Sequence, residues 1–133
     1  GYPSITLIED DIRSADCYLV MDGCTPAGSF VFRQGPDPSY ASIRDGHWAE
    51  DSSPYMVIHR ITSLPEAHGV FASSMEFCKS RCGNIRIDTH EDNLIMRHLV
   101  IKHGFRHCGT ITLAGGGGER LAYQWLRPAH PDE

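Results

Sequence analysis

The second half of the chain alternates between strand-like and helix-like segments, and this alternation constrains the fold more than any other feature. Tyr55–Ile61 (YMVIHRI) and Ile85–Thr89 (IRIDT) are rich in β-branched residues and are predicted to be strands. Between them, apolar residues at helical spacing predict a helix over Gly69–Cys82, with an apolar face that consists of Phe71, Met75, Cys78 and Cys82. A strand, a helix and a strand in this order predict two parallel strands joined by a crossover.

A second helix and a final hairpin are predicted after this unit. Asp92 or Asn93 is the expected N-cap of the helix, and Gly104 is a natural residue to follow its last turn. Two strands, Arg106–Leu113 and Leu121–Leu126, come next and are joined through a loop with four consecutive glycines.

The N-terminal third is predicted to hold a short helix, a hairpin and a long loop. Thr6 and Glu9 have the spacing of a capping box, so a helix is expected over Thr6–Ser14. Cys17–Met21 and Ser29–Arg33 are the predicted strands of the hairpin, and the polar stretch after them is expected to be a loop. The element order is therefore α-β-β-β-α-β-α-β-β, an α/β (mixed α+β) fold with a central mixed sheet flanked by helices.

Size and charge exclude several classes of protein. With 133 residues, the chain is expected to form one domain, residues 1–133. Its net charge of −5 argues against a nucleic-acid partner, because binding to phosphates requires a basic surface. No apolar run approaches the roughly 20 residues that span a bilayer, and the opening GYPSITLIEDD is acidic, unlike a signal peptide. We therefore expect a cytoplasmic protein with no membrane partner.

Five cysteines and eight histidines raise the question of a metal or redox site. An odd number of cysteines without a secretory signal favours free thiols, and Cys108 is expected to be a small buried residue rather than a nucleophile. No CxxC pair and no HExxH motif is present, so no metal is expected. A metal-binding or redox domain is still an alternative, and it would use His90, His98, His103, His107 and Cys108.

The junction between the Tyr55–Ile61 strand and the next helix has the features of an anion site. A short loop and Gly69 precede the helix, whose first N–H groups have no partner within the helix. These groups and the positive end of the helix dipole favour a phosphate. They belong to Gly69, Val70, Phe71 and Ala72. An ordinary crossover from a strand to a helix has the same features, so both interpretations stay open at this point.

The stretch IRIDTHEDNLIMRHLVIKHGFRHCGTI resembles the acetyl-CoA-binding half of the GNAT N-acetyltransferase superfamily. In that family, a strand and a Q/R-x-x-G-x-G/A loop precede a helix and a second strand, and the motif N-x-x-A-x-x-L-Y-x-K-x-G-F follows. The phrases VIHRITS, IRIDTHEDN and GFRHCGTI are similar to an uncharacterised bacterial branch, and the resemblance covers Gly1 to Trp125. The residues that match the second motif are Asn93, Leu99, Lys102, Gly104 and Phe105.

The resemblance implies that an acetyl group is transferred from acetyl-CoA to a primary amine of a small molecule or a peptide. The amine would attack the thioester directly, with acetyl-CoA as the cosubstrate and no metal. The pantetheine would lie between the third strand and the IRIDT strand, and the pyrophosphate would lie on the loop after the third strand. The implied cofactor-binding residues are Ile61, Ala67, His68, Gly69, Val70, Phe71, Ala72, Asn93 and Lys102.

A base must remove a proton from the incoming ammonium group, and the resemblance implies that the third strand carries it. His59 and Tyr55 lie on one face of this strand, because side chains alternate along a strand. His59 is the better proton acceptor near neutral pH, and a core histidine bonded to a carbonyl is the alternative. Arg86 and Asp88 share a strand face and are expected to pair. The preceding loop is either solvated or the source of an acceptor pocket formed by His47, Trp48, Glu50 and Asp51.

Three residues depart from the family pattern. Glu66 stands where glutamine or arginine is usual, and Phe71 stands where a second small residue is usual. Val100 replaces the tyrosine with which many members protonate the departing thiolate. A non-catalytic acyl-CoA-binding module is therefore the alternative function.

The chain starts where family members have their second helix, so the usual first strand and first helix are expected to be missing. The sheet would then lack an edge strand, and Cys17–Met21 would have an unpaired side. We therefore expect either a homo-oligomer that pairs through this edge or a longer native product.

Overall fold

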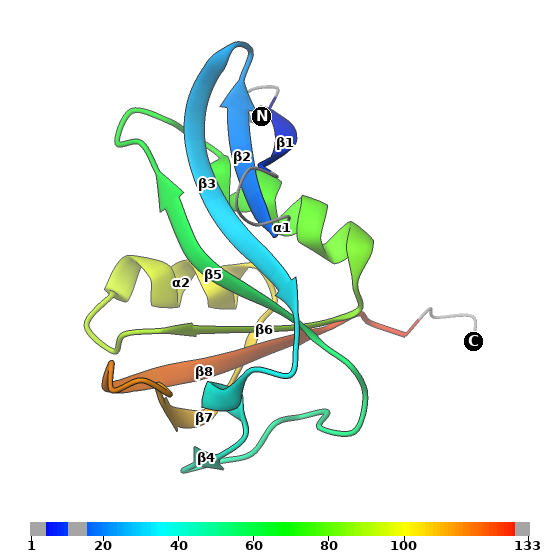
Figure 1. Cartoon of the computed structure of the whole chain (residues 1–133), viewed down its shortest axis with the longest axis vertical. Helices are drawn as coiled ribbons and strands as arrows, with labels where there is room; N and C mark the ends of the chain where they lie inside the picture. Colours follow the sequence, from blue (N-terminus) through cyan, green and yellow to red (C-terminus); the bar gives the residue numbers. More distant parts are fainter. Residues whose placement is uncertain (1–4, 11–15, 130–133) are drawn as a thin grey trace.

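In the described part of the chain, eight strands form one sheet in the order β1-β2-β3-β5-β6-β8-β7-β4 (Figure 1). The structure is a computed structural model that describes residues 5–10 and 16–129. The strands are β1 (Ile5–Asp10), β2 (Cys17–Asp22), β3 (Thr25–Gln34), β4 (Ile43–Arg44), β5 (Met56–Ser63), β6 (Asn84–Thr89), β7 (Arg106–Thr112) and β8 (Glu119–Leu126). The helices are the 3-10 turn η1 (Pro38–Tyr40), α1 (Val70–Arg81) and α2 (Leu94–Lys102).

The sheet is mixed, as the sequence predicts. Among the described strands, only β5 and β6 run parallel, joined by the crossover helix α1, and every other neighbouring pair is antiparallel. The predicted strands and helices from Cys17 onward are confirmed to within a few residues. The long polar loop before β5 differs from the prediction, because it contains η1 and the short edge strand β4.

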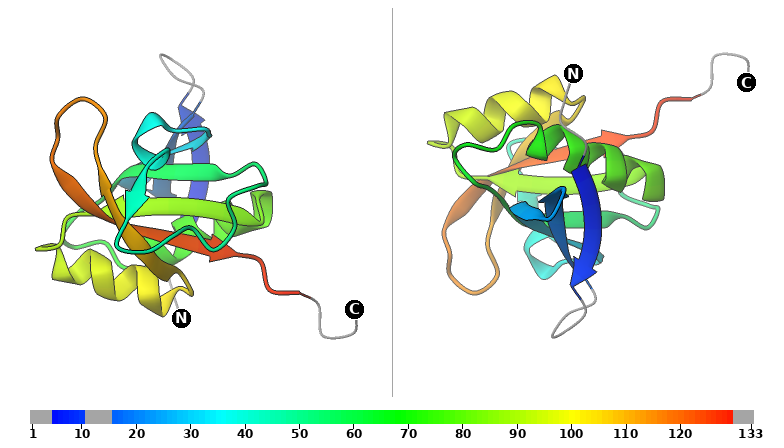
Figure 2. Two further views of the ribbon diagram at one scale, coloured as in Figure 1. Left: turned by 90° about the horizontal axis from the view of Figure 1, so that it is seen from below. Right: turned by 90° about the horizontal axis from the view of Figure 1, so that it is seen from above.

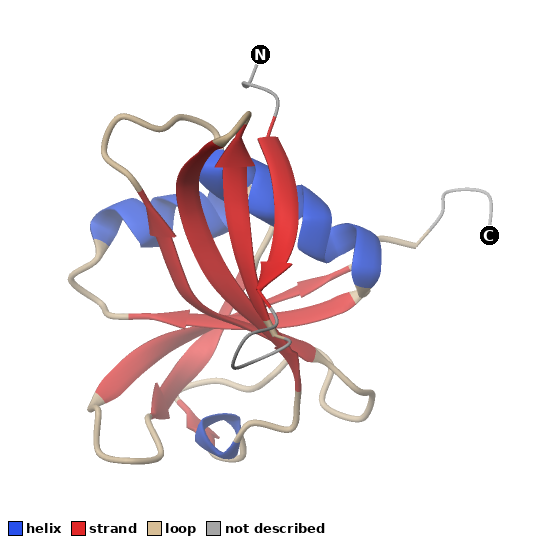
Figure 3. Cartoon of the chain, turned by 45° about the horizontal axis from the view of Figure 1, so that its top comes forward, coloured by secondary structure: helices blue, strands red, loops and turns tan. Residues whose placement is uncertain are grey.

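Two layers of side chains cover the two faces of the sheet. Both α-helices lie on one face, and η1 lies on the other (Figures 2 and 3). The helix side forms the larger core, in which Met75 of α1 and Val100 of α2 meet Ile58 and Ile85 of the central strands. On the opposite face, buried residues from the loop pack on the sheet; they are Tyr40 and Trp48, which meet Val57, Cys108, Ile111 and Ala122.

The segment before β2 is a strand, and the predicted helix over Thr6–Ser14 is wrong over Thr6–Asp10; residues 11–15 lie outside the described part. β1 pairs antiparallel with β2 along its whole length, with Ile5 opposite Asp22 and Asp10 opposite Cys17. A capping box is a local signal that contributes only about 1 kcal/mol, and a full ladder of strand hydrogen bonds outweighs it. The expected unpaired edge at Cys17–Met21 is therefore also wrong, and the argument for self-association through that edge fails.

A glycine with a positive φ precedes α1, and an asparagine N-cap precedes α2. α1 begins after Gly69, whose φ of 75° lies in the left-handed region that favours glycine. α2 begins after Asn93, whose side chain accepts a hydrogen bond from the N–H of Met96 at 3.1 Å. Asn93, rather than Asp92, is thus the N-cap of α2. No helix in the described residues is long and apolar enough to cross a membrane.

A bulge in β5 bends this strand away from β6. Val31 of β3 faces His59, yet Ser29 faces Thr62, so β5 holds one residue more than β3 over this interval. The bulge coincides with Arg60, which has a φ of 52°. β5 and β6 pair only over Met56–Ile58 and Ile85–Ile87, and the two strands then diverge toward their carboxyl ends (Figure 1).

The close approach of β3 to β5 generates a stability prediction at Gly28. A Cβ here would overlap the carbonyl oxygen of Thr62 and lie 2.8 Å from Cγ1 of Val70. We expect Gly28→Ala to lower the free energy of unfolding by about 1–3 kcal/mol, as overpacking does, in urea denaturation. The control is Gly83→Ala, whose Cβ would have its nearest neighbour at 3.4 Å, on Arg127. Equal losses in the two variants would contradict this account.

Candidate functional site

A cavity of about 240 Å³ opens where β5 and β6 diverge. It lies at the carboxyl ends of two parallel strands, where ligands bind in open α/β sheets. Polar groups from both strands reach it, and so do the start of α2 and one residue of β8. Its lining consists of Ile58, His59, Arg60, Ile61, Ile87, Asp88, Thr89, His90, Asn93, Met96 and Arg120.

The backbone of β5 is an open edge on this side. Beyond Ile58, β6 no longer pairs with β5, so the N–H and C=O groups of β5 that face β6 have no strand partner. An extended ligand with amide groups can add to such an edge as a strand does. Ile61 lies on this free part of β5 and lines the cavity.

His59 is held by a carboxylate from the loop. Its Nε2 lies 2.9 Å from Oδ2 of Asp37, and the side chains of His59 and Asp37 are 28% and 17% exposed. When Nε2 donates its hydrogen to Asp37, the lone pair of Nδ1 is free, because no other hydrogen bond to His59 is present among the described residues. The pair therefore has the geometry of a proton acceptor with a fixed tautomer.

Tyr55 supports this pair without reaching the cavity. Its hydroxyl accepts a hydrogen bond from the N–H of Asp37 at 2.9 Å, and Asp37 in turn accepts one from the N–H of Ser39 as the N-cap of η1. Tyr55 therefore positions Asp37. The shared strand face of Tyr55 and His59 is as predicted, but only His59 lines the cavity.

Asp88 is a second carboxylate at the cavity. Its Oδ2 accepts a hydrogen bond from the hydroxyl of Tyr40 at 2.6 Å. Burial raises the pKa of Asp88, while the Tyr40 bond and the charges of His59 and Arg120 act in the opposite direction. Burial also raises the pKa of Tyr40 well above its ordinary value, and Asp88 adds to this effect. Tyr40 thus stays a hydrogen-bond donor to Asp88.

The predicted phosphate loop lies at the start of α1, and its helix end is free. Gly69 provides no side-chain cap, so the first N–H groups of α1 have no side-chain partner. Phe71 does not obstruct this end. Its ring is 9% exposed and packs into the core with Met75, with His103 at 5.1 Å. Ala67 is half-buried, and the side chains of Glu66 and His68 are exposed.

Of the remaining residues that the family resemblance singled out, one lines the cavity and two do not. Asn93 lines the cavity, although its side-chain oxygen is used as the N-cap of α2. Lys102 is exposed at the other end of α2 and does not line the cavity. Val100 is fully buried in the core.

The loop around His47–Asp51 does not form part of the cavity. Arg86, only 1% exposed, lies between the rings of Trp48 and Tyr55, with its guanidinium carbon 4.0 and 3.9 Å from their centroids. It donates to the carbonyl of Glu50 and to Asp51, both at 3.0 Å. The expected pairing of Arg86 with Asp88 is therefore wrong, because the two side chains have different partners.

No metal cluster is present in the part of the chain that the structure describes. No three side chains of histidine, cysteine, aspartate or glutamate gather there in a way that could hold an ion. Cys108 is buried, and burial raises the pKa of its thiol. The prediction that Cys108 is a small buried residue is confirmed.

The fold of this chain is similar to that of solved acetyltransferases. An acetyltransferase of the GNAT family from Streptococcus agalactiae 2603 is 28% identical in sequence, and the match covers 90% of this chain and 70% of that one with a TM-score of 0.76. The chain has the GNAT acetyltransferase fold. A GNAT-family acetyltransferase from Bacillus cereus ATCC 10987 is 16% identical, with a TM-score of 0.59 over 89% of this chain and 75% of that one.

A further match has a cofactor and a peptide in place. The NatC complex bound to Gag peptide and CoA contains a chain with 14% identity and a TM-score of 0.63, over 93% of this chain and 99% of that one. The GNAT resemblance of the sequence is thus confirmed in the fold. No protein-family model matches the sequence, and no curated protein is significantly similar to it.

Sequence reasoning identified His59 but not its neighbours. Asp37 and Tyr40 come from the loop before β5, where the sequence suggested other residues for an acceptor pocket, and Asp88 was expected to pair with Arg86. The signal at Asp37 was available, since an aspartate followed by proline is typical of a capped helical turn. That signal predicts η1, but it cannot predict that η1 folds back onto β5.

The raised pKa of Asp88 generates a pH prediction. The folded chain binds a proton at Asp88 over a pH range in which the unfolded chain has released it, so stability falls as pH rises through this range. Asp88→Asn removes this dependence. We therefore expect its free energy of unfolding, relative to the parent protein, to increase from acidic toward neutral pH in urea titrations.

A second variant, Tyr40→Phe, is expected to raise the pKa of Asp88 further. Tyr40→Phe removes a hydrogen bond that lowers the pKa of Asp88, so the loss of stability with rising pH should extend to higher pH than in the parent. If the stability difference between Asp88→Asn and the parent is the same at every pH, Asp88 has no raised pKa.

Proposed function

We propose that the protein transfers an acetyl group from acetyl-CoA to a primary amine of a small molecule or a peptide. The cavity where β5 and β6 diverge, lined by His59 and Asp88 within a GNAT fold, is the observation that supports this function most. The cavity joins an open strand edge, suited to an extended cofactor, to a proton acceptor.

The residues of this chain fit two parts of a CoA molecule, its pantetheine and its pyrophosphate. Its pantetheine amides would pair with the free backbone of β5 near Ile61, as an added strand would. Its pyrophosphate would bind the uncapped N–H groups of Gly69, Val70, Phe71 and Ala72, beside Ala67 and His68. Glu66 is exposed and can turn toward solvent, and Phe71 turns into the core, so both departures are compatible with a bound anion.

His59 is the proposed base. An amine arrives as an ammonium ion and must lose a proton before it can attack the thioester. Asp37 holds the ring of His59, so that the free nitrogen accepts the proton and the resulting imidazolium is stabilised by the carboxylate. Tyr55 holds Asp37 in turn and is proposed as a positioning residue, although the sequence suggested it as a base.

Asp88 is proposed to bind the acceptor rather than to take its proton. Its carboxylate faces the cavity next to His59, and an ammonium ion there would compensate the burial that raises its pKa. A non-catalytic acyl-CoA-binding module is the second candidate. It is favoured by Val100, which is buried and offers no acid for the departing thiolate.

Binding of the cofactor is tested at Gly69. CoA should raise the melting temperature of the protein, because a ligand that binds only the folded state stabilises it. Gly69→Asp should abolish this shift, since it places a carboxylate among the N–H groups proposed for the pyrophosphate. Gly69→Asn is the matched control, because asparagine has the same shape and tolerates a positive φ but has no charge. An equal CoA shift in both variants would place the phosphate elsewhere.

Catalysis is tested at His59. We expect His59→Ala to lower kcat about 10²–10⁴-fold with little change in the KM for acetyl-CoA, since the base acts in the transition state. Asp37→Asn should cause a smaller loss and alter the pH profile of kcat, because it removes the charge that stabilises the imidazolium. The assay follows thiol release against a panel of primary amines. CoA binding without turnover on any amine would favour the binding module.

A further inference from the structure

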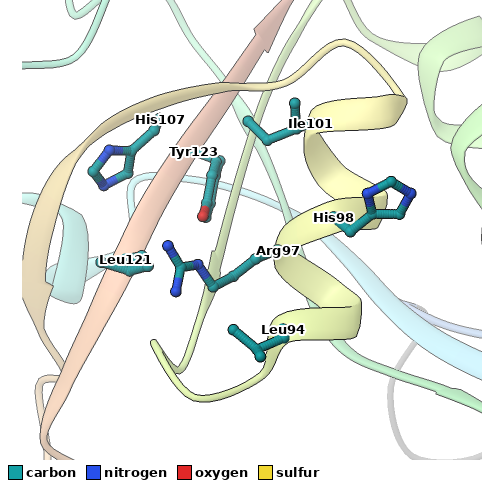
Figure 4. Close-up of a pocket in the computed structure, with 7 residues that line it drawn as sticks. All are labelled: Leu94, Arg97, His98, Ile101, His107, Leu121 and Tyr123. Carbon is teal, nitrogen blue, oxygen red and sulfur yellow. The ribbon is translucent and has the colours of Figure 1, made fainter.

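A second hollow, of about 520 Å³, lies between α2 and the strands β7 and β8 (Figure 4). It uses a different face of α2 from the cavity described above, since Asn93 and Met96 line that cavity and Leu94, Arg97 and Ile101 line this hollow. We call it the α2 groove. Its volume lies within the usual range for small-molecule sites, roughly 300–1,000 Å³.

The floor of the α2 groove is apolar and open to solvent. Leu94 and Ile101 of α2 are 68% and 53% exposed, which is unusual for large apolar residues on one helix face. Leu121 of β8 lines the opposite wall. These side chains can bind an apolar group of a ligand.

Tyr123 of β8 provides a polar group beside these apolar side chains. The residue is only 3% exposed, yet its hydroxyl makes no hydrogen bond to any described residue and points into the α2 groove (Figure 4). Because this hydroxyl opens onto the groove and has no partner in the described protein, it is free to donate a hydrogen bond to a ligand atom or a water there. His107 lies beside it, with ring centroids 5.3 Å apart.

Arg97 provides a permanent positive charge in the same place. Its side chain extends from α2 across the groove toward β8 (Figure 4). One guanidinium nitrogen donates to the carbonyl of Glu91 at 2.9 Å, and the other N–H groups have no partner among the described residues. A guanidinium with free N–H groups matches the two oxygens of a carboxylate.

The charges around the α2 groove select an anion. None of its lining residues is acidic, although the whole chain has a net charge of −5. A second copy of the chain is disfavoured as the occupant, because a symmetric contact would bring two copies of Arg97 together. One permanent cation and one hydroxyl suit a single carboxylate better than a doubly charged phosphate.

We propose that the α2 groove binds a small apolar monocarboxylate, a function distinct from the acyl transfer proposed above. The carboxylate pairs with Arg97 and accepts a hydrogen bond from Tyr123. The aliphatic or aromatic part lies on Leu94, Ile101 and Leu121. None of these residues lines the cavity between β5 and β6, so the two sites can be filled together.

The test is calorimetric titration of the full chain with sodium octanoate, with 1-octanol as the uncharged counterpart. Octanoate should bind at one site, also when CoA is present at saturation, and octanol should bind at least tenfold more weakly. Arg97→Gln should weaken octanoate roughly tenfold or more, and Tyr123→Phe should weaken it several-fold. Arg106→Gln is the matched control, because Arg106 is an exposed arginine on β7 that does not line the groove, and octanoate affinity should not change.

Several results would overturn the proposal. Equal affinity for octanoate and octanol would leave no role for Arg97 and Tyr123. Competition between octanoate and CoA would place octanoate in the other cavity. Unchanged octanoate affinity in a folded Arg97→Gln protein would show that Arg97 does not bind the carboxylate. A concentration-dependent dimer in sedimentation, with no octanoate binding, would show that a second copy of the chain occupies the groove. The outcome does not depend on acetyl transfer, so failure here leaves the proposed function intact.

Discussion

The early end of the pairing between β5 and β6 is the constraint on which the rest of the site depends. Had the two strands paired along their full length, their backbone groups would satisfy one another and no cavity would form between them. The bulge at Arg60 prevents this, because the extra residue bends β5 while its pairing with β3 continues on the other edge. The bent strand thus stays part of the sheet and offers a free edge to a ligand.

A buried arginine holds the polar side of this site in place. Burial of Arg86 is costly unless its charge is compensated, and two ring faces, a carbonyl and a carboxylate compensate it. One of those rings belongs to Tyr55, whose hydroxyl holds the backbone of Asp37, and Asp37 holds His59. The geometry of the proposed base is therefore set by a chain of contacts that begins at a buried residue outside the cavity lining.

Elements that are stabilised by interactions between residues close in sequence could be predicted, and those that depend on distant residues could not. Helices α1 and α2 and most strands were predicted, because their signals lie within the element: the apolar spacing around Met75, the cap at Asn93, the glycine after α2. The N-terminal segment was misassigned, because β1 exists only through its pairing with β2. The partner of His59 was missed for the same reason, since Asp37 is brought to it by the fold of a loop whose residues have no periodic pattern.

The acyl transfer to an amine that we propose places two opposed requirements on the charges at the cavity. An acceptor is attracted as a cation, yet it can attack only after it becomes neutral. In the proposed mechanism Asp88 supplies the attraction, and it would stabilise the ammonium form if it acted alone. His59, the proposed base, would resolve this conflict, because it lines the same cavity and would take the proton beside the carboxylate of Asp37, which stabilises an imidazolium. On this reasoning, the proton stays in the cavity while the amine that carried it becomes reactive.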